Sequence, residues 1–272
     1  MRGRETRGMR LGLRWILAAA AMAALLDAGC GGGGPGAKPR NSPDLSTMVR
    51  VPAGEFLRGR DDGDPDERPA RRVWLDEFYV DRTEVTNRDF RAFCDATRYL
   101  YPSNPSFDPG YLVDKPDHPV VNITWEQARA YCAWAGKRLP TEAEWEKAAR
   151  GTDGRLYPWG NSWGDSLANI HGQPFDRTAP VGSLRQGGSP YGVLDLAGNV
   201  WEWCADWYLL EYYAQAPNRN PPGPAGPTPW RVVRGGGFTS PRSDAETMNR
   251  SKNDPSLVIH HLGCRCAWSK GR

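Results

Sequence analysis

The segment Tyr191–Tyr208 places acids and glycines beside three tryptophans, a combination unusual for a surface loop or a core strand. Within it, Asp195 and Glu202 supply carboxylates, and the backbone carbonyls of Gly198 and Val200 lie between them. Ca²⁺ takes about six to eight oxygen ligands and often mixes carboxylates with carbonyls. Glycine permits the sharp turn that such a site needs, and the tryptophans on either side of the glutamate would face away from it. These residues indicate a calcium site, and the alternative is a hydrogen-bonded structural turn.

The histidines are a weaker candidate for a metal site. His260 and His261 are adjacent, whereas His118 and His171 lie far from them in the sequence. A metal site needs ligands that converge from several elements, and nothing in this spacing requires convergence. We therefore interpret the four histidines as surface or turn residues.

Two further patterns contain residue types that occur in catalytic sites. Gly160–Gly164 matches the Gly-x-Ser-x-Gly nucleophile elbow, which needs a strand before Ser162 and a helix after it. The flanking residues predict neither element, so we interpret Ser162 as an ordinary turn residue. Glu142 and Glu146 have ordinary helical spacing and no evident basic partner, and we interpret them as part of a solvated helix face.

Three capped segments predict the helices that must position these residues. They are Thr86–Cys94, Thr124–Gly136 and Thr141–Gly151, each of which begins at a threonine that can accept a backbone hydrogen bond. In the second and third segments, Gln127 and Glu144 complete capping boxes. Both of these segments end at a glycine, which suits the residue after a helix.

The remainder predicts short strands and loops, in keeping with 31 glycines and 24 prolines among 272 residues. Met48–Gly59 alternates loosely, and Arg231–Gly236 is a short β-branched run that stops at glycines. Cys264–Trp268 predicts a strand whose two cysteines face the same side. Pro217–Pro229 is rich in proline and predicts an irregular surface loop.

Residues 1–29 predict an export signal, with a basic start and an apolar run, Trp15–Leu26, too short to span a bilayer. An Ala-Gly pair before Cys30 resembles a bacterial lipoprotein cleavage box, although Asp27 stands where leucine is usual. We expect Cys30 to be lipidated and residues 30–47 to form a flexible tether. The protein would then be exported and anchored to a bacterial membrane, with the outer membrane facing the periplasm as the favoured location. The alternative is an ordinary secretory signal with a chance cysteine.

Charge and cysteine content limit the partners. The signal carries five arginines against Glu5 and Asp27, so its removal brings 35 basic and 32 acidic side chains to equal numbers. This balance gives no basic excess for binding nucleic acid. With Cys30 lipidated, an odd number of cysteines remains, namely Cys94, Cys132, Cys204, Cys264 and Cys266. At least one of them then stays free or pairs between chains.

Several stretches, in order and spacing, resemble the formylglycine-generating enzyme (sulfatase-modifying factor) domain over about residues 48–270. The block Gly136-KRLPTEAEWE together with Gly198-NVWEW is the most specific of them. The others are Met48-VRVPAGEFLRG, Phe78-YVDRTEVTNRDFRAF, His118-PVVNITWEQARAYCAWA, Tyr157-PWGN, Thr178-APVGS, Arg231-VVRGGGF and Gly263-CRCA.

The resemblance implies an α+β fold of low regular secondary structure, related to C-type lectins, with three short helices and short antiparallel strands. Its calcium turn falls on Asp195, Gly198, Val200 and Glu202. A second calcium site would begin at Asn169 and Ile170, where the shortened loop that follows offers only Asp176. The structural disulfide of the family falls on Cys132 and Cys266.

The catalytic residues of the family are missing. Formylglycine-generating enzymes use two cysteines, which bind copper(I) and oxidise a sulfatase cysteine to an aldehyde, and soft thiolates suit copper(I). Here the region Arg234–Ser251 contains no cysteine. Ser240 stands at the first cysteine position, an ungapped count places Ala245 at the second, and Gly237 replaces the serine of the motif. Copper is therefore not expected.

Three functions follow from these residues. The favoured one is a non-catalytic, lipid-tethered domain that binds an envelope protein or a glycan through a groove lined by Phe238–Asn249. The second is oxidative tailoring of a secreted metabolite, which would need another redox centre at His260, His261 or Cys264. The third is formylglycine generation itself.

Overall fold

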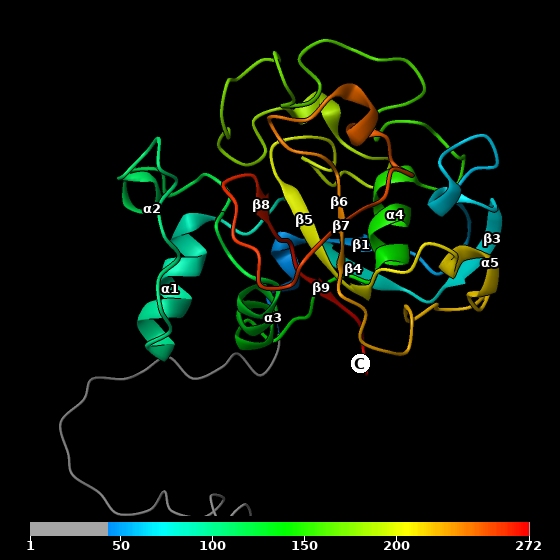
Figure 1. Ribbon diagram of the computed structural model, residues 1–272, viewed down its shortest axis with the longest axis horizontal. Coiled ribbons are helices and arrows are strands. Elements are labelled where there is room, and N and C mark those ends of the chain that lie inside the picture. The colour runs from blue at the N-terminus through cyan, green and yellow to red at the C-terminus, as the bar shows by residue number, and fades with distance from the viewer. Residues whose placement is uncertain (1–42, 272) are drawn as a thin grey trace, which may run out of the picture. The chain divides into compact units, whose positions relative to one another are not determined.

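The computed structural model describes residues 43–271, and the predicted export signal and Cys30 lie outside the described residues. The predicted helices are confirmed (Figure 1). They are α1 (Asn87–Thr97), α3 (Trp125–Trp134) and α4 (Glu142–Arg150), and the predicted threonine caps each of them by accepting from a backbone N–H of the first turn. Both predicted capping boxes are also present. Among the described residues, no helix is long and apolar enough to cross a membrane.

Short strands form three small sheets. One contains β1 (Met48–Val51), β4 (Phe78–Asp81) and β9 (Ala267–Trp268), and a second pairs β2 (Gly54–Arg58) with β3 (Arg71–Leu75). The third has the order β7-β6-β5-β8, with bounds Ser251–Asn253, Arg231–Arg234, Trp201–Trp207 and Leu262–Gly263. Among the strands that the structure describes, β5 and β8 pair in parallel and the other pairs are antiparallel, so the expectation of short antiparallel strands holds except at β8.

Single helical turns connect these elements. They are η1 (Leu45–Thr47), η2 (Pro65–Glu67), α2 (Tyr111–Asp114), η3 (Arg185–Gly187), α5 (Tyr212–Gln215) and η4 (Arg242–Ala245). Pro217–Pro229 contains neither helix nor strand, as its proline content predicts. Figure 1 shows α4 beside β6, and β5 leading through the middle of the domain.

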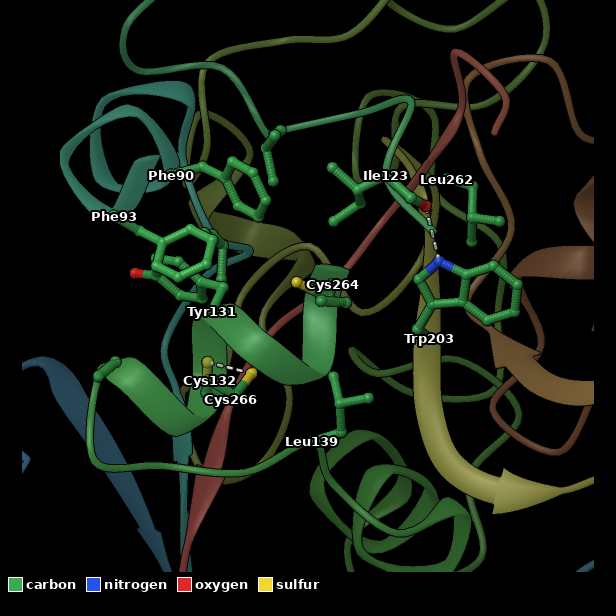
Figure 2. Close-up of a cluster of buried hydrophobic side chains, with 14 of the residues drawn as sticks. Phe90, Phe93, Ile123, Tyr131, Cys132, Leu139, Trp203, Leu262, Cys264 and Cys266 are labelled. Atoms are coloured by element: carbon green, nitrogen blue, oxygen red, sulfur yellow. Dashed lines mark hydrogen bonds between the residues drawn. The ribbon is translucent and has the colours of Figure 1, made fainter. Parts of the chain in front are cut away.

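The predicted strand Cys264–Trp268 is only partly correct. The chain pairs at Leu262–Gly263 and again at Ala267–Trp268, while the three residues between them belong to no strand. The reason is a change of partner, since the first pair joins β5 in one sheet and the second joins β4 in another. The two cysteines nevertheless face the same side, because both belong to the larger hydrophobic cluster with α1 and α3 (Figure 2).

The interpretation of Glu142 and Glu146 as solvated was wrong. Every residue of α4 is buried, and both carboxylates are completely inaccessible. Glu142 pairs with Arg58 at 2.8 Å and with Arg250 at 2.6 Å, and Glu146 pairs with Arg234 at 2.9 Å. Burial of these charges is possible because each is paired. The partners come from β2, from β6 and from the end of the following loop, so helical spacing gave no sign of them.

Candidate functional site

The candidate site begins directly after β6, at the three consecutive glycines Gly235–Gly237. Gly235 and Gly236 have positive φ angles of 98° and 75°, and a side chain at Gly235 would meet the ring of Trp145 at 3.1 Å. After this tight passage, Ser240 closes a turn. Its hydroxyl oxygen accepts from the N–H of Gly237 at 3.2 Å, and its own N–H donates to the carbonyl of Gly237 at 2.8 Å. Its carbonyl accepts from the N–H of His171. Ser240 therefore serves as a buried turn residue.

The described cysteines lie away from this turn. All five are buried, in α1, α3, β5 and the segment between β8 and β9. Ala245, at the second expected cysteine position, is fully buried in a small apolar cluster with Ala168, Ile170 and Ala197. Neither position offers a soft ligand, so the described residues around Ser240 provide no thiolate pair for copper(I).

Two histidines and two phenylalanines form a cluster beside the turn, which we call the histidine–aromatic cluster (Phe107, Phe238, His260 and His261). His260 contacts Phe107 edge to face at 5.2 Å between ring centroids, and His261 at 4.9 Å. Burial, and next the charge of His260, lower the pKa of His261 to about 4. The buried Nδ1 of His261 has no hydrogen-bond partner. At neutral pH the imidazole of His261 is therefore uncharged where it lies beside the turn.

A second aromatic group contacts the turn through Arg242, and we call it the tryptophan turn (Tyr157, Trp159 and Trp163). Tyr157 stacks on Trp159 with ring centroids 5.2 Å apart and planes within 6°, and Trp163 meets both edge to face. The guanidinium of Arg242 lies 4.9 Å from the centroid of Trp163. Ser162 is exposed in this loop, with neither a strand before it nor a helix after it, so the nucleophile elbow does not form.

The exposed part of the expected groove is short. Within Phe238–Asn249, only Thr239, Pro241, Arg242 and Ser243 are exposed, and most of the others are buried in the domain. A cavity of about 220 Å³ lies against α1 and α3 instead, and none of its lining residues belongs to Phe238–Asn249. The exposed surface of Phe238–Asn249 is therefore one turn, Thr239–Ser243, and the groove itself stays a prediction.

The histidines do not converge on a metal site. His118 Nδ1 lies 3.0 Å from the hydroxyl of Thr178, and His171 is exposed. Cys264 is buried in the larger hydrophobic cluster with Cys132. Across residues 43–271, no group of three or more His, Cys, Asp or Glu side chains is placed to hold a metal ion. His260 and His261 thus contact each other in the histidine–aromatic cluster, whereas Cys264 lies in the larger hydrophobic cluster, and the alternative redox centre stays a prediction.

The calcium turn has the expected backbone form, but its glutamate is already paired. Gly198 has a φ of 82°, and a side chain there would lie 2.3 Å from the carbonyl oxygen of Asn169. Glu202 is fully buried, and Arg265 donates to both of its oxygens, at 2.6 and 2.7 Å. The indole of Trp145 donates to it as well, at 2.7 Å. Arg265 thus neutralises Glu202 without requiring an ion.

Two nearby oxygens lack partners and fit a hard cation better. Glu84 and Asn169 are both 2% exposed, and Glu84 Oε2 and Asn169 Oδ1 have no hydrogen-bond partner. Burial, and next the charge of Asp195, raise the pKa of Glu84 well above its ordinary value. Hard cations prefer such oxygen donors. Asp195 next to Glu84, and separately Asn169, thus offer oxygen donors of the kind that Ca²⁺ takes. Asp176 is exposed, and the carbonyl of Ile170 accepts from Gln173.

Sequence reasoning missed two residues of this region, Glu84 and Arg265. Both lie in stretches that carry the family resemblance, but neither was assigned a role. The signal for Arg265 was its place between two cysteines that face the core, because alternation sends the intervening side chain to the opposite side, towards Glu202. No comparable signal marked Glu84.

The two cysteines expected to pair lie together. Cys132, on α3, and Cys266, just before β9, have their sulfur atoms 2.6 Å apart, and both residues are fully buried (Figure 2). Next to Cys266, the ammonium group of Lys137 lies 2.6 Å from Asp81, whose other oxygen accepts from the N–H of Cys266. The two cysteines thus bring α3 into contact with the segment just before β9, and their disulfide stays a prediction.

The fold is that of one protein class, and the chain belongs to it: the sulfatase-modifying factor enzyme 1-like domain family matches residues 35–270. Among its curated relatives, the formylglycine-generating enzyme of Thermomonospora curvata is 37% identical over 84% of this chain and 96% of its own length. The Bos taurus enzyme is 35% identical, over 86% and 78%. The inactive Cα-formylglycine-generating enzyme 2 of Mus musculus is 34% identical, over 83% and 86%.

Solved structures agree on the fold. PvdO from Pseudomonas aeruginosa is 28% identical and superposes with a TM-score of 0.72, covering 87% of this chain and 99% of its own. Treponema denticola variable protein 1 is 25% identical with a TM-score of 0.68, covering 81% and 94%. The family thus includes proteins named as active enzymes and one named as inactive, so membership alone does not decide between catalysis and binding.

Proposed function

We propose that this protein is a non-catalytic binding module of the sulfatase-modifying factor family, tethered by lipid to the cell envelope, which binds an envelope protein or a glycan. The observation that carries the proposal is Ser240. It takes the place of the first catalytic cysteine, and its hydroxyl is engaged in the turn with Gly237. A hydroxyl cannot replace a thiolate as a copper(I) ligand.

The exposed turn Thr239–Ser243 and the two aromatic groups beside it are the proposed recognition surface. Aromatic side chains supply large contact areas at low entropic cost, and arginine adds a charged donor. Arg242 is exposed and held over Trp163, with its guanidinium 3.6 Å from Asp165. A surface of this composition suits a sugar ring or an extended peptide, because both present flat faces and hydrogen-bonding groups.

The competing function is oxidation, either formylglycine generation or tailoring of a metabolite. Identities of 35–37% to proteins named as formylglycine-generating enzymes favour it. The relative named as inactive, at 34%, shows how little identity separates the two outcomes. The residues around Ser240 therefore carry more weight than overall identity in this choice.

Copper(I) titration decides between binding and oxidation. The exported domain is titrated with copper(I) and then incubated with oxygen and a cysteine-containing sulfatase peptide, with the Thermomonospora curvata relative as positive control. We expect no tight stoichiometric copper binding and no aldehyde by mass spectrometry. Stoichiometric copper binding followed by aldehyde formation would refute the proposed function.

Site-specific photocrosslinking tests the recognition surface. A photoreactive residue is placed at Ser243 in the proposed surface, or at the exposed Glu55 of β2 as the matched control, in cells that carry the full chain. We expect a discrete adduct from Ser243 alone. Adducts of equal yield from both positions, or from neither, would contradict a recognition role for the turn.

Lipid attachment at Cys30 and calcium binding are proposed as well. Labelled fatty acid should be incorporated into the full chain and not into a Cys30→Ser variant. For calcium, Asp195→Asn should abolish the rise in melting temperature that Ca²⁺ produces relative to chelator. Glu202→Ala would unfold the domain through the loss of the Arg265 pair, so it cannot report on the ion by itself. An Asp195→Asn protein that keeps the full calcium shift would exclude the site.

A further inference from the structure

Three cysteines meet in the larger hydrophobic cluster, although a disulfide uses only two. Cys132 projects from α3, while Cys264 and Cys266 belong to the segment between β8 and β9. All three are completely inaccessible to solvent. Figure 2 shows the sulfur atoms of Cys264 and Cys266 on the side of the segment that faces α3.

Arg265, the residue between the two cysteines, fixes the orientation of the segment so that both cysteines face Cys132. Arg265 is fully buried and points the other way, where its guanidinium donates to both oxygens of Glu202. Successive side chains of an extended segment alternate. The segment therefore cannot rotate to hide Cys264 without breaking the Arg265–Glu202 pair, which would leave a buried charge uncompensated.

We propose that Cys132 has two disulfide partners, Cys266 and Cys264, and that thiol–disulfide exchange moves the bridge between them. The thiol of Cys264 loses its proton, and the thiolate attacks the sulfur of Cys132. The Cys132–Cys264 bond forms as the Cys132–Cys266 bond breaks, and Cys266 leaves as a thiolate that takes up a proton. No external oxidant is consumed. The inference rests on the proposed export, which supplies the oxidising compartment for the first bridge.

Burial makes the exchange slow in the folded domain. Burial raises the pKa of the Cys266 thiol to about 12, which makes Cys266 a slow leaving group. Cys264 is itself completely inaccessible to solvent, so exchange proceeds during oxidative folding or when this segment opens. Each bridge isomer then persists once the core has closed.

The two bridges differ in what they tether. Moving the attachment point from Cys266 to Cys264 shifts it by two residues, about 7 Å of extended chain. The shift is towards His261, whose Cβ and carbonyl lie 3.3 Å from the position that a side chain at Gly237 would take. The Cys264 bridge therefore restrains the histidine–aromatic cluster directly, whereas the Cys266 bridge restrains β9 and Asp81.

Peptide mapping distinguishes the two bridges. The exported full chain is blocked with N-ethylmaleimide at mildly acidic pH, denatured, and digested with trypsin without reduction. Trypsin cleaves after Arg265 and so separates the candidate partners into Asn253–Arg265 and Cys266–Lys270, while the third cysteine lies in Ala130–Lys137. We expect both cross-linked pairs in the native chain, with their ratio changing after unfolding and refolding in a glutathione redox buffer.

Matched variants complete the test. Cys266→Ser should retain a bridge through Cys264, Cys264→Ser should show the Cys266 bridge alone, and Cys94→Ser should leave the native pattern unchanged, because Cys94 donates to the carbonyl of Leu100 instead. A chain with only the Cys266 bridge, both as isolated and after refolding in glutathione, would overturn the proposal. Alkylated Cys132 in the oxidised native chain would also overturn it, and neither result bears on the copper and aldehyde assay of the proposed function.

Discussion

Glu142→Gln tests whether the buried charge cluster under α4 stabilises the domain. Glu142 is fully buried between three arginines, Arg58, Arg234 and Arg250. Burial alone would raise the pKa of this carboxyl group, but the charges of the arginines outweigh it and lower the pKa from 4.5 to about 2. Glutamine keeps the shape of the side chain and removes its charge, so the variant isolates this electrostatic contribution.

The expected loss follows from the pKa shift. A difference of roughly 2.5 pKa units between the unfolded and folded states corresponds to about 3 kcal/mol of unfolding free energy. Because the folded-state pKa is lowered, the stabilisation is complete above pH 4.5 and is lost as the pH falls towards 2. At pH 3 the difference between the native chain and the variant should be smaller by about 2 kcal/mol than at pH 7.

Urea unfolding followed by tryptophan fluorescence measures this loss at both pH values. The control is Glu77→Gln, which breaks the exposed pair with Arg50 and should cost about 0–1 kcal/mol at pH 7. If Glu142→Gln is no more destabilising than Glu77→Gln, or if its effect is the same at pH 3 and pH 7, the assignment of Glu142 as a stabilising buried anion is wrong.

Three other substitutions have outcomes set by local geometry. Gly198→Ala should cost about 2–4 kcal/mol in thermal unfolding, because its side chain would lie 2.3 Å from Asn169, whereas Gly172→Ala, with open space, should cost less. Burial, then a neighbouring glutamate, raises the pKa of Asp206 from 3.8 to about 7. Asp206 ionises near pH 3.8 in the unfolded chain and only near pH 7 in the folded one, so the native fold loses stability as the pH rises between these values. At pH 8, Asp206→Asn should therefore be more stable than the native chain by up to about 4 kcal/mol. Arg231→Lys should cost about 1–2 kcal/mol in urea unfolding, because the guanidinium lies 3.6 and 3.4 Å from two tryptophan ring centroids. If Gly198→Ala is as stable as Gly172→Ala, or if Asp206→Asn is as stable as the native chain at pH 8, the corresponding assignment is wrong. An unchanged urea midpoint for Arg231→Lys would likewise contradict the role given to its guanidinium.

The helices were predictable because their signals are local. A threonine cap and the glutamine or glutamate three residues later lie within one turn of each other, and the structure places each cap as expected. The end of β6 was equally local, because its β-branched run stops at Gly235 and Gly236, which have positive φ angles. Short-range patterns of this kind require no knowledge of the rest of the fold.

Burial of α4 was not predictable in the same way. Its polar face looks like a solvent face until Arg58, Arg234 and Arg250 are brought to it from distant parts of the chain. The same holds for Glu202, whose partner Arg265 lies 63 residues away. In both cases, pairing with residues distant in the sequence overrides the solvent exposure that amphipathic spacing suggests. A single sequence does not show which charged side chains will come together.

The candidate site also has one part that was predictable from the sequence and one part that was not. The absence of cysteine around Ser240 could be seen in the sequence, but the position of its hydroxyl in a turn could not. Likewise, the two cysteines flanking Arg265 were expected to face one side, and they do so even though no continuous strand contains them. The side they face is set by the buried guanidinium between them.

The distances along the chain between Arg58, Glu142 and Arg250 have a consequence for biogenesis. Arg58 precedes α4 in the chain, whereas Arg250 follows Glu142 by 108 residues. The full set of arginines around Glu142 is therefore present only after Arg250 has been synthesised, so the charge cluster under α4 reaches its native form late in synthesis.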